Sequence, residues 1–376
     1  MRHYCYIYAI EAIMYIHEKP NWTQFYWNAA EVDPLVSKVC HAQGVLYGRL
    51  LGLGFDNRIK NLADNLTKDV VRSSEIEGIE LNMDEVRSSV ANRLGIENDT
   101  NIAPSHRIEA VVEVMVSAME HYDQLLTDEK LWGWQSAFFQ DGHSRGSRLE
   151  VGRYRTCEEQ VVSGMFGRER VHYEAPKPER VPFEMHRFLE WFNGYDNKPW
   201  VIRSAIAHFW FVCIHPFEDG NGRLARILAD MQLARGEELR MRFYNVSGQI
   251  NKDRKNYYRI LEETQNGTGD ITRWLVWFMH TLLYSLQEAE ECLDRVLVKT
   301  NFWNHFAEVP LSARQKKILN LYLNGYEGKI SSKNWAHLGK CSSDTANRDL
   351  QDLCEKGLIT CDDMLAKRRT YHLVQV

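Results

Sequence analysis

The sequence predicts a mainly α-helical protein with one β-hairpin and a small second domain at the C-terminal end. An apolar segment from Ile202 to Ile214 contains no Gly or Pro, which is typical of a buried helix. Two short strand patterns flank the Gly-Met-Phe-Gly stretch at 164–167, which indicates a hairpin. After Pro310, short amphipathic helices are followed by two further strand patterns, and this order predicts the second domain.

Composition excludes several classes of protein. The chain has 376 residues, enough for two or three domains, and is 44% hydrophobic and 11% aromatic, as expected for a globular protein. A net charge of −5 argues against a protein that is cationic over its whole surface, and the apolar runs are too short for a membrane span. Eight cysteines without a Cys-x-x-Cys pair predict reduced thiols and a cytoplasmic location.

The N-terminal region is predicted to be a Trp-rich module over residues 1–60. Residues 1–13 look like an upstream extension without a structural role, because a more typical sequence begins at Met14; they also lack the features of a signal peptide. Trp22, Phe25 and Trp27 precede a helical pattern from 35 to 51. We expect these aromatic rings to pack on the main domain, with a binding role as the alternative.

Residues 61–94 are predicted to be helical, and one helix end in this region is polar. Ser73 and Glu77 are four positions apart and therefore share a helix face, and Gly78 can end the helix. Taken alone, this pattern indicates a solvated surface. A polar linker at 95–106 separates this region from the predicted core at 95–290.

The first half of the core is predicted to contain helices and the hairpin. A target segment could add to the free edge of the hairpin as an extra strand, so we expect a protein partner near residues 161–174; the alternative is a plain surface hairpin. Elements are expected in the order helix 107–125, helix 128–139, loop 142–152, strand 160–164, strand 170–174 and helix 183–192.

The most informative stretch joins two predicted helices, at His215-Pro216-Phe217-Glu218-Asp219-Gly220-Asn221-Gly222-Arg223-Leu224-Ala225-Arg226. The second helix should begin near Asn221 or Gly222 and run through Ala234, with its free N–H groups at the loop. Arg223 and Arg226 leave one face of that helix, and two guanidiniums beside free N–H groups suit a chain of phosphates.

Two further side chains of this stretch fit phosphate chemistry. Asp219 offers a hard oxygen ligand for Mg²⁺ bound to the phosphates. His215 lies at the other end of the loop, where a neutral imidazole could accept a proton from an incoming hydroxyl. The sequence therefore predicts nucleotidyl transfer at this loop; the alternative is a glycine-rich connection between two core helices.

The same residues resemble the signature of the Fic (Fic/Doc) family, His-Pro-Phe-x-Asp/Glu-Gly-Asn-Gly-Arg-x-x-Arg, and match every fixed position. The resemblance implies a Fic helical core with a β-hairpin flap. It also implies transfer of AMP from ATP to a protein Ser, Thr or Tyr hydroxyl, with His215 as base and Asp219 as the Mg²⁺ ligand. The residues implied to hold the nucleotide are Asp219, Gly220, Asn221, Gly222, Arg223, Leu224, Ala225 and Arg226, with Arg226 at the γ-phosphate.

Residues 73–78 resemble the family's inhibitory motif, Ser/Thr-x-x-x-Glu-Gly/Asn. The resemblance implies that Ser73, Glu77 and Gly78 are regulatory. Glu77 would pair with Arg226 and occupy the γ-phosphate position, because an Arg–carboxylate fork competes with an Arg–phosphate fork.

The region after the signature is expected to wall the adenine. Tyr257 and Tyr258 match a tyrosine-containing position of the family, with core packing as the alternative for one of them. Helices are expected at 251–262 and 274–286, followed by a charged helix at 287–310 that ends at Pro310.

The C-terminal segment at 301–376 resembles a winged helix-turn-helix domain. Helices are expected at 313–323, 331–338 and 342–356, and strands at 358–360 and 370–373. The segment has 11 Lys and Arg against 8 Asp and Glu, so DNA contact through 342–369 is open. Ser343, Thr345, Asn347 and Arg348, with 367–369, could form a basic face, but Asp344, Asp349 and Asp352 share the helix and would repel phosphates.

Several alternatives remain at this stage. The chain could be a DNA-binding regulator whose core senses nucleotide or modifies itself. Within the family, it could use another nucleotide, transfer phosphocholine or phosphate, or remove AMP. Self-modification and a homodimer are expected possibilities, and the sequence does not name the target protein.

Overall fold

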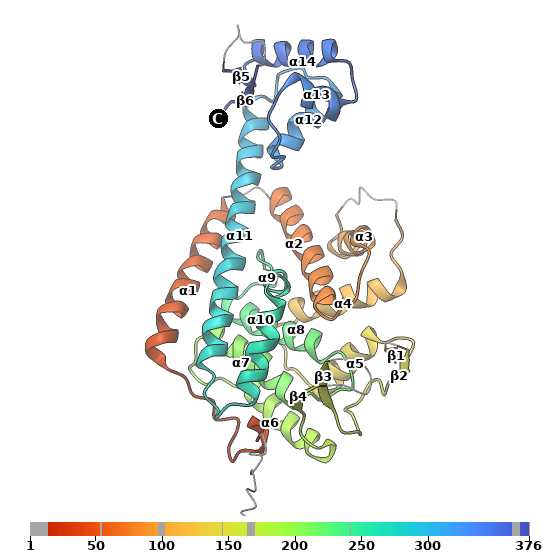
Figure 1. Ribbon diagram of the computed structural model, residues 1–376, viewed down its shortest axis with the longest axis vertical. Coiled ribbons are helices and arrows are strands. Elements are labelled where there is room, and N and C mark those ends of the chain that lie inside the picture. Colours follow the sequence, from red (N-terminus) through yellow and green to blue (C-terminus); the bar gives the residue numbers. More distant parts are fainter. Residues whose placement is uncertain are drawn as a thin grey trace, which may run out of the picture. The chain divides into compact units, whose positions relative to one another are not determined.

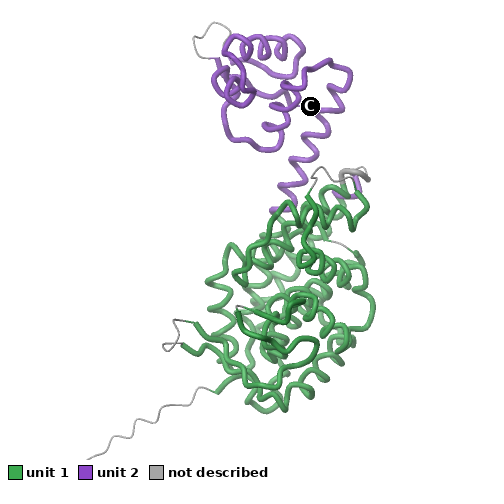
Figure 2. Tube along the Cα trace, turned by 90° about the vertical axis from the view of Figure 1, so that its right-hand side faces the viewer, with its two compact units in different colours: residues 1–48, 58–287 green, residues 49–57, 288–376 purple. Residues whose placement is uncertain are grey.

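The computed structural model describes residues 14–52, 55–96, 102–144, 146–163, 170–240, 242–362 and 369–375. The predicted extension at 1–13 lies outside these residues. The chain divides into two compact units, the first formed by residues 1–48 and 58–287 and the second by 49–57 and 288–376 (Figure 2). Among the described residues, no helix is long and apolar enough to cross a membrane.

Two helices form the centre of the first unit (Figure 1). α7 (Trp200–Ile214) is apolar on all sides, and every residue after Trp200 is buried, so it is a core helix. α8 (Asn221–Glu237) packs along α7 and is buried through most of its length. Both helices were predicted, and the loop between them carries the signature.

The other helices of this unit surround the pair. They form where apolar residues recur on one face, as in α6 and α10, and where caps such as Asn82 and Thr127 satisfy the first N–H groups. The surrounding helices are α1 (Ala29–Leu51), α2 (Phe55–Ile76), α3 (Met83–Leu94), α4 (His106–Glu120), α5 (Asp128–Phe138), α6 (Val181–Asn193), α9 (Val246–Lys252), α10 (Arg254–Gln265) and α11 (Thr272–His305), with 3₁₀ turns η1 (Ile16–Glu18) and η2 (Pro178–Arg180).

The strands of the first unit form two antiparallel hairpins. The larger pairs β3 (Gln160–Ser163) with β4 (Arg170–Glu174), as the sequence predicted, and the connecting residues 164–169 lie outside the described part. The smaller pairs β1 (His143–Ser144) with β2 (Ser147–Arg148), where a loop was expected. That prediction was wrong because two-residue strands leave no alternating pattern in a sequence.

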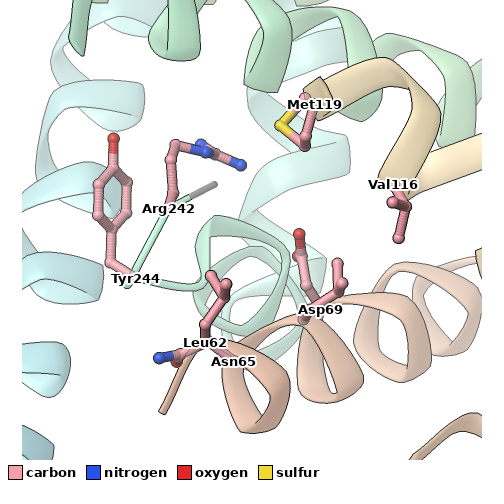
Figure 3. Close-up of a pocket in the computed structure, with 8 residues that line it drawn as sticks. Leu62, Asn65, Asp69, Val116, Met119, Arg242 and Tyr244 are labelled. Carbon is pink, nitrogen blue, oxygen red and sulfur yellow. The ribbon is translucent and has the colours of Figure 1, made fainter. Parts of the chain in front are cut away.

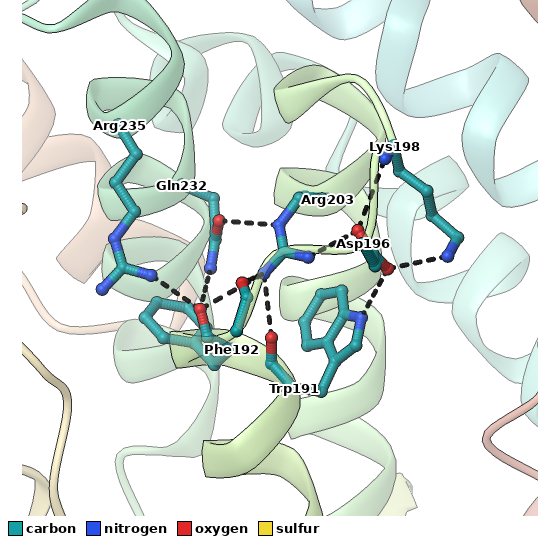
Figure 4. A network of polar contacts seen from close by, with 8 residues as sticks. Trp191, Phe192, Asp196, Lys198, Arg203, Gln232 and Arg235 are labelled. Atoms are coloured by element: carbon teal, nitrogen blue, oxygen red, sulfur yellow. Dashed lines mark hydrogen bonds and ion pairs between the residues drawn. The ribbon is translucent and has the colours of Figure 1, made fainter.

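A buried arginine ties α6, α7 and α8 together (Figure 4). Arg203 of α7 is fully buried; it pairs with Asp196 at 2.6 Å and donates to the backbone carbonyls of Trp191 and Gly194 at 2.9 Å. Gln232 of α8 accepts from Arg203 at 3.3 Å. The end of α6 is thereby fixed to the two central helices.

The aromatic residues of the N-terminal region pack on this core, as predicted. Trp22 is 4% exposed, lies edge-on to Trp210, and donates to the buried Glu184 at 3.2 Å. Phe25 packs against Phe209 and Trp210.

The second unit has its own hydrophobic core around Trp335, Leu350 and Ile318. Its helices and strands follow the predicted order. They are α12 (Ala313–Leu323), α13 (Ser332–Gly339), α14 (Ser343–Glu355), β5 (Ile359–Cys361) and β6 (Tyr371–Leu373), with β5 antiparallel to β6. Ser342 caps α14 by accepting from the Thr345 N–H.

Several predicted helices have different bounds. α4 ends at Glu120, before the expected 125, where the His121 N–H bonds the Ser117 carbonyl. The helix expected at 251–262 is two helices divided at Asp253. The helices expected at 274–286 and 287–310 are one helix, α11, which ends at His305 rather than at Pro310.

Candidate active site

The loop from α7 to α8 has a fixed, tightly turned backbone. His215 has φ +50° and Gly220 has φ +93°, and a Cβ at Gly220 would lie 3.1 Å from the Phe139 ring. The Asn221 side chain accepts from the Phe217 N–H at 3.0 Å and donates to the Phe217 carbonyl at 2.7 Å. The Asn221 side chain therefore holds the loop in shape, which leaves its backbone N–H as the group that can meet a ligand.

The first turn of α8 has N–H groups at this loop that no carbonyl of the helix accepts from. The N–H groups of Asn221, Gly222 and Arg223 precede the first helical bond, which Leu224 makes to the Gly220 carbonyl at 3.0 Å. Leu224 and Ala225 are fully buried, so their side chains belong to the core and do not face a ligand. The helix N-terminus is a site for an anion.

Arg223 lies beside this N-terminus with part of its guanidinium unpaired. It is 4% exposed and stacks over the rings of Phe138 and Phe139, at 4.4 and 4.9 Å. Its Nε and Nη2 atoms have no hydrogen-bond partner among the described residues. Burial lowers the pKa of Arg223 to about 10, although the nearby carboxylates of Asp219 and Glu77 oppose this shift. The guanidinium therefore stays charged at neutral pH.

Arg226, one turn further along α8, is held by the end of α2. Its Nη2 lies 2.8 Å from Glu77 Oε1 and donates to the Ser73 carbonyl at 2.8 Å, while its Nε donates to Ser73 Oγ at 2.9 Å. Burial alone would lower the pKa of Arg226, but Glu77 raises it above the usual value. The pair expected between Glu77 and Arg226 is thus present in the structure.

Glu77 also lies against the start of α8. A Cβ added to Gly222 would collide with the Glu77 carboxylate, so a larger residue there would displace that carboxylate. Helix α2 ends at Ile76, and Gly78 follows two positions later with φ +75°. This left-handed conformation is the one predicted for a glycine that ends a helix. A carboxylate of the chain itself therefore lies at the anion site.

His215 is oriented for proton transfer. Its Nδ1 lies 3.2 Å from the Val212 carbonyl; a carbonyl only accepts, so the proton is on Nδ1 and Nε2 keeps a lone pair. Burial lowers its pKa to about 4, and the carboxylates of Glu77 and Asp219 offset part of this effect. The imidazole is neutral near pH 7, as a general base must be.

Asp219 lies at the mouth of the loop, in a cleft of about 330 Å³ that Glu77 and Arg107 also line. One Asp219 oxygen accepts from Ser144 of β1 and the other from the Gly220 N–H at 2.6 Å. The described residues contain no group of three His, Cys, Asp or Glu that could hold a metal alone. One carboxylate is nevertheless sufficient for Mg²⁺ that arrives with a nucleotide, because phosphates and water supply the other ligands.

The two candidate tyrosines of α10 have different surroundings. Tyr257 is 2% exposed, bonds His208 Nε2 at 2.9 Å, and packs on Trp277, so it belongs to the core. Tyr258 is 39% exposed and donates to the Ile76 carbonyl at 3.2 Å. Of the two, Tyr258 is the one that can meet a nucleotide.

Buried charged residues lie near α2 and α8, and Figure 3 shows Asp69 of α2 and Arg242 at one cavity. Arg242 pairs with Asp230 of α8 at 2.5 Å, and the cavity that Asp69 and Arg242 line has a volume of about 30 Å³, room for one water molecule. Burial raises the pKa of both carboxyls, while Arg242 opposes that rise.

The β3–β4 hairpin is fixed to the same loop. Arg155, 2% exposed, donates through Nε to the His215 carbonyl at 2.8 Å, and its N–H donates to the Pro216 carbonyl at 2.9 Å. Tyr173 of β4 donates to the Cys213 carbonyl at 2.7 Å. The hairpin base thus positions residues on both sides of His215.

The candidate DNA-contact residues of the second unit are only partly as expected. Asp349 is buried and accepts from Arg314 at 2.7 and 2.9 Å, so it faces inward. The expectation that Asp349 would repel phosphates is therefore wrong. Arg348 and Asp344 are exposed, and Asn347 bonds Ser332. Residues 367 and 368 lie outside the described part.

Sequence reasoning missed residues that come to the loop from other elements. Ser144, Phe138 and Phe139 lie 75 or more positions before the loop residues that they contact. Nothing in their local pattern marks them, apart from the density of Arg and aromatic residues between 138 and 155.

Comparison with known proteins gives two matched regions. Residues 125–233 match the Fic/DOC family, and residues 15–96 match a domain of unknown function, DUF4172. The chain is similar to a protein adenylyltransferase Fic of Nematostella vectensis, 29% identical over 172 residues, which cover 40% of this chain and 36% of that protein. The same comparison finds a probable protein adenylyltransferase of Aquifex aeolicus, 24% identical over 57% of this chain and 60% of that protein. The chain thus spans between about a third and three fifths of the length of these relatives.

Solved structures show the same fold. The crystal structure of a Fic family protein from Desulfovibrio desulfuricans superposes with a TM-score of 0.52 at 22% identity, covering 91% of this chain and 96% of that one. A Fic domain containing signaling protein from Bacteroides thetaiotaomicron gives a TM-score of 0.50 at 20% identity and covers 67% of this chain. The mainly helical fold predicted from the sequence is confirmed; the winged-helix assignment of the second unit stays a prediction.

Proposed function

We propose, from the premise that residues 125–233 form a Fic/DOC family domain, that this chain transfers AMP from ATP to a Ser, Thr or Tyr hydroxyl of a protein. The observation that carries the proposal is Arg223, a buried cation beside the N-terminus of α8 whose Nε and Nη2 atoms have no partner among the described residues. Unpaired buried donors are costly to a fold, and a bound polyphosphate would satisfy them. The names of the curated relatives support the same reaction.

The transfer step uses His215 as its base. The target hydroxyl oxygen attacks the α-phosphorus, a new P–O bond forms, the bond to the β-phosphate breaks, and pyrophosphate leaves. The hydroxyl proton passes to His215 Nε2, whose lone pair is free because Nδ1 is held by Val212. The N–H groups of α8 and Arg223 would stabilise the charge on the phosphates as it moves to the leaving group.

Magnesium fits this site as a companion of the nucleotide. Asp219 would hold it, because its carboxylate lies at the loop and Mg²⁺ commonly takes one protein carboxylate together with phosphate oxygens. When bound, the ion would neutralise phosphate charge. Ser144, which donates to Asp219, orients that carboxylate.

Glu77 inhibits the transfer in this proposal. Its carboxylate lies 2.8 Å from Arg226 and against Gly222, where the terminal phosphate would bind. Arg226 can form one fork at a time, so ATP in its productive pose requires Glu77 to leave. Removing the carboxylate should raise activity by about 10-fold or more, since an ion pair at a buried site is worth 1.4 kcal/mol or above.

The acceptor would dock along the β3–β4 hairpin. That sheet has two strands, so each has a free edge that an extended segment of the target can join. Tyr173 and Arg155 fix the hairpin to the backbone around His215, which would set the acceptor hydroxyl relative to the base. Other nucleotides and AMP removal are the alternatives that the same site permits.

The test incubates purified protein and lysate with ATP labelled at the α-phosphorus. Wild type, Glu77→Gly, His215→Ala and the double variant are compared by the label retained on lysate proteins, which is measured separately from any label on the chain itself. We expect strong labelling by Glu77→Gly, weak labelling by wild type, and a loss of about 10²-fold or more wherever His215 is replaced. Equal labelling by wild type and Glu77→Gly would remove the inhibitory role, and labelling that survives His215→Ala would remove the proposed base.

A DNA-binding role for the second unit is the competing proposal. It is favoured by Asp349, which faces inward and leaves Arg348 exposed on α14. Retention of a DNA duplex in a gel shift by His215→Ala, lost in Arg348→Ala, would support it. No retention at low salt would contradict it.

A further inference from the structure

A serine, a histidine and a glutamate lie in line on the hairpin, apart from the signature loop. Ser163 Oγ of β3 lies 2.5 Å from His172 Nε2 of β4, and His172 Nδ1 lies 2.8 Å from Glu262 Oε2 of α10. The other Glu262 oxygen, Oε1, pairs with Arg170 at 2.5 Å. None of these residues takes part in the mechanism proposed above.

A break in strand register places His172 in this line. Val161 faces Tyr173 and Val162 faces Val171, so His172 is an extra residue of β4 with no partner on β3. Such a bulge turns a side chain away from its regular direction, and bulges recur beside active sites. Here the bulge directs the imidazole to Ser163, which faces Arg170 in the next pair.

The contacts fix the direction of the hydrogen bond to Glu262. A carboxylate only accepts, so His172 carries a proton on Nδ1 and donates it to Glu262. In a neutral imidazole, Nε2 is then the acceptor, and the Ser163 hydroxyl donates to it. Nucleophile, base and orienting carboxylate stand in the order that activates a serine hydroxyl.

The serine is accessible, and its strand pair is tied to the nucleotide site. Ser163 is exposed, whereas His172 and Glu262 are about three-quarters buried, with side-chain exposures of 22% and 24%. Tyr173, the neighbour of His172, donates to the Cys213 carbonyl, two residues before His215. An activated hydroxyl is therefore carried on the segment where the acceptor is expected.

We propose that Ser163 is an activated nucleophile and that it is the chain's own acceptor for AMP, an inference that rests on the proposed function. Ser163 Oγ attacks the α-phosphorus of ATP held on a signature loop, of the same chain or of a second copy. A P–O bond forms to Ser163, the bond to the β-phosphate breaks, and pyrophosphate leaves. The Ser163 proton passes to His172 Nε2, and Glu262 positions the imidazole.

Peptide mapping by mass spectrometry tests the acceptor. Three proteins are incubated with ATP and Mg²⁺: Glu77→Gly, Glu77→Gly with Ser163→Ala, and Glu77→Gly with Ser147→Ala. Ser147 serves as the control because it is another exposed serine on a hairpin. We expect one AMP on the Ser163 peptide, its loss in Ser163→Ala and no change in Ser147→Ala. AMP found on other hydroxyls, with the Ser163 peptide unmodified, would overturn the proposal.

The roles of His172 and Glu262 have their own readouts. His172→Ala should slow modification of Ser163 by about 10²-fold, and added imidazole should restore part of the rate, because a free base can enter the space left. Glu262→Gln should lower the rate and Glu262→Asp should recover part of it. Unchanged rates in His172→Ala would contradict an activated serine.

A reaction without nucleotide separates this inference from the proposed function. A fluorophosphonate probe forms a P–O bond to an activated serine and releases fluoride, with the proton taken by the neighbouring imidazole. We expect it to label Ser163 in wild type and in His215→Ala, and to leave Ser163→Ala unlabelled. If no AMP is transferred anywhere but the probe labels Ser163, the proposed function fails and the activated serine stands; a Ser163 that the probe never labels overturns this inference.

Discussion

Two buried charges, one in each unit of the molecule, differ in how completely the fold bonds them. In the second unit, Asp349 accepts from Arg314 and, at 3.0 Å, from the indole of Trp335, so the buried carboxylate is fully bonded by the fold. In the first unit, Arg223 is as buried but keeps two nitrogen atoms unpaired. In the described part of the chain, every buried side-chain nitrogen or oxygen without a partner lies between Tyr47 and Asn266.

This difference indicates which charge serves the fold and which serves a ligand. A buried polar group without a partner costs about 1–3 kcal/mol, so a fold keeps one where another molecule completes it. Arg226 lies between the two cases, because Glu77 bonds it in the resting state and a phosphate would replace Glu77. Under the proposed function, the comparison therefore separates a self-sufficient unit from a unit that nucleotide would complete.

The largest effect should follow removal of the unpaired cation. Arg223→Met in the Glu77→Gly background should reduce AMP transfer by about 10²–10³-fold, the cost of one oriented donor at a reacting phosphate, and leave the free energy of unfolding within about 1 kcal/mol. Initial rates and denaturant unfolding measure both.

Arg235 is the matched control for Arg223. Its three donors already bond the backbone carbonyls of Tyr122, Phe192 and Gln124, so Arg235→Met should lose stability and keep the transfer rate per folded molecule. If Arg223→Met unfolds the protein while Arg235→Met does not, Arg223 serves the fold, and its proposed role toward a ligand is contradicted.

A second prediction concerns stability in acid. Burial lowers the pKa of His208 to about 3, from the usual 6.5. Below pH 6.5, His208 binds a proton in the unfolded chain but not in the folded chain. The free energy of unfolding therefore falls as the pH falls, and His208 accounts for about 3 kcal/mol of that loss at pH 4.

Variants at two histidines measure that contribution. Tm between pH 7 and pH 4 should fall less steeply in His208→Gln than in wild type. His121→Gln, at an exposed position, should follow the wild-type slope. Identical slopes for all three proteins would show that His208 does not stay neutral in the folded state.

The third prediction tests the self-sufficient unit. Asp349→Ala leaves the Trp335 indole and Arg314 without their acceptor and should cost about 2 kcal/mol, less than a fully buried pair because Arg314 is 35% exposed. Asp352→Ala on the same helix, at a more exposed site, should cost under about 1 kcal/mol. AMP transfer by either folded variant should be unchanged, and a loss of transfer in Asp349→Ala would contradict the separation.

The smallest effect is a flat pH profile. Burial lowers the pKa of His215 to about 4, so in the free enzyme the base is already neutral at pH 6. Because kcat/KM reports the free enzyme, it should change less than about 2-fold between pH 6 and 8 on account of this residue. An acid limb with its midpoint near pH 6.5 would show that His215 is not desolvated.

Local patterns predicted the site better than long-range contacts did. His215, Asp219 and the start of α8 are specified within twelve residues, so the sequence alone indicated the loop and its chemistry. The contact between Glu77 and Arg226 joins residues 149 positions apart and was expected only through the family resemblance.

Other contacts had no signal in the sequence. The rings of Phe138 and Phe139 reach Arg223 only because α5 packs beside α8, and Ser144 reaches Asp219 from a two-residue strand. The bulge at His172 depends on strand register, which hydrophobic alternation over four or five residues does not specify.

The position of the label tests the central claim most directly. Glu77→Gly is incubated with Mg²⁺ and ATP labelled either at the α-phosphorus or at the γ-phosphorus, and the label retained on protein is measured. If the triphosphate lies across the α7–α8 loop with His215 beside the α-phosphorus, protein retains the α label and pyrophosphate carries the γ label away. Retention of the γ label, or of neither, would contradict the account.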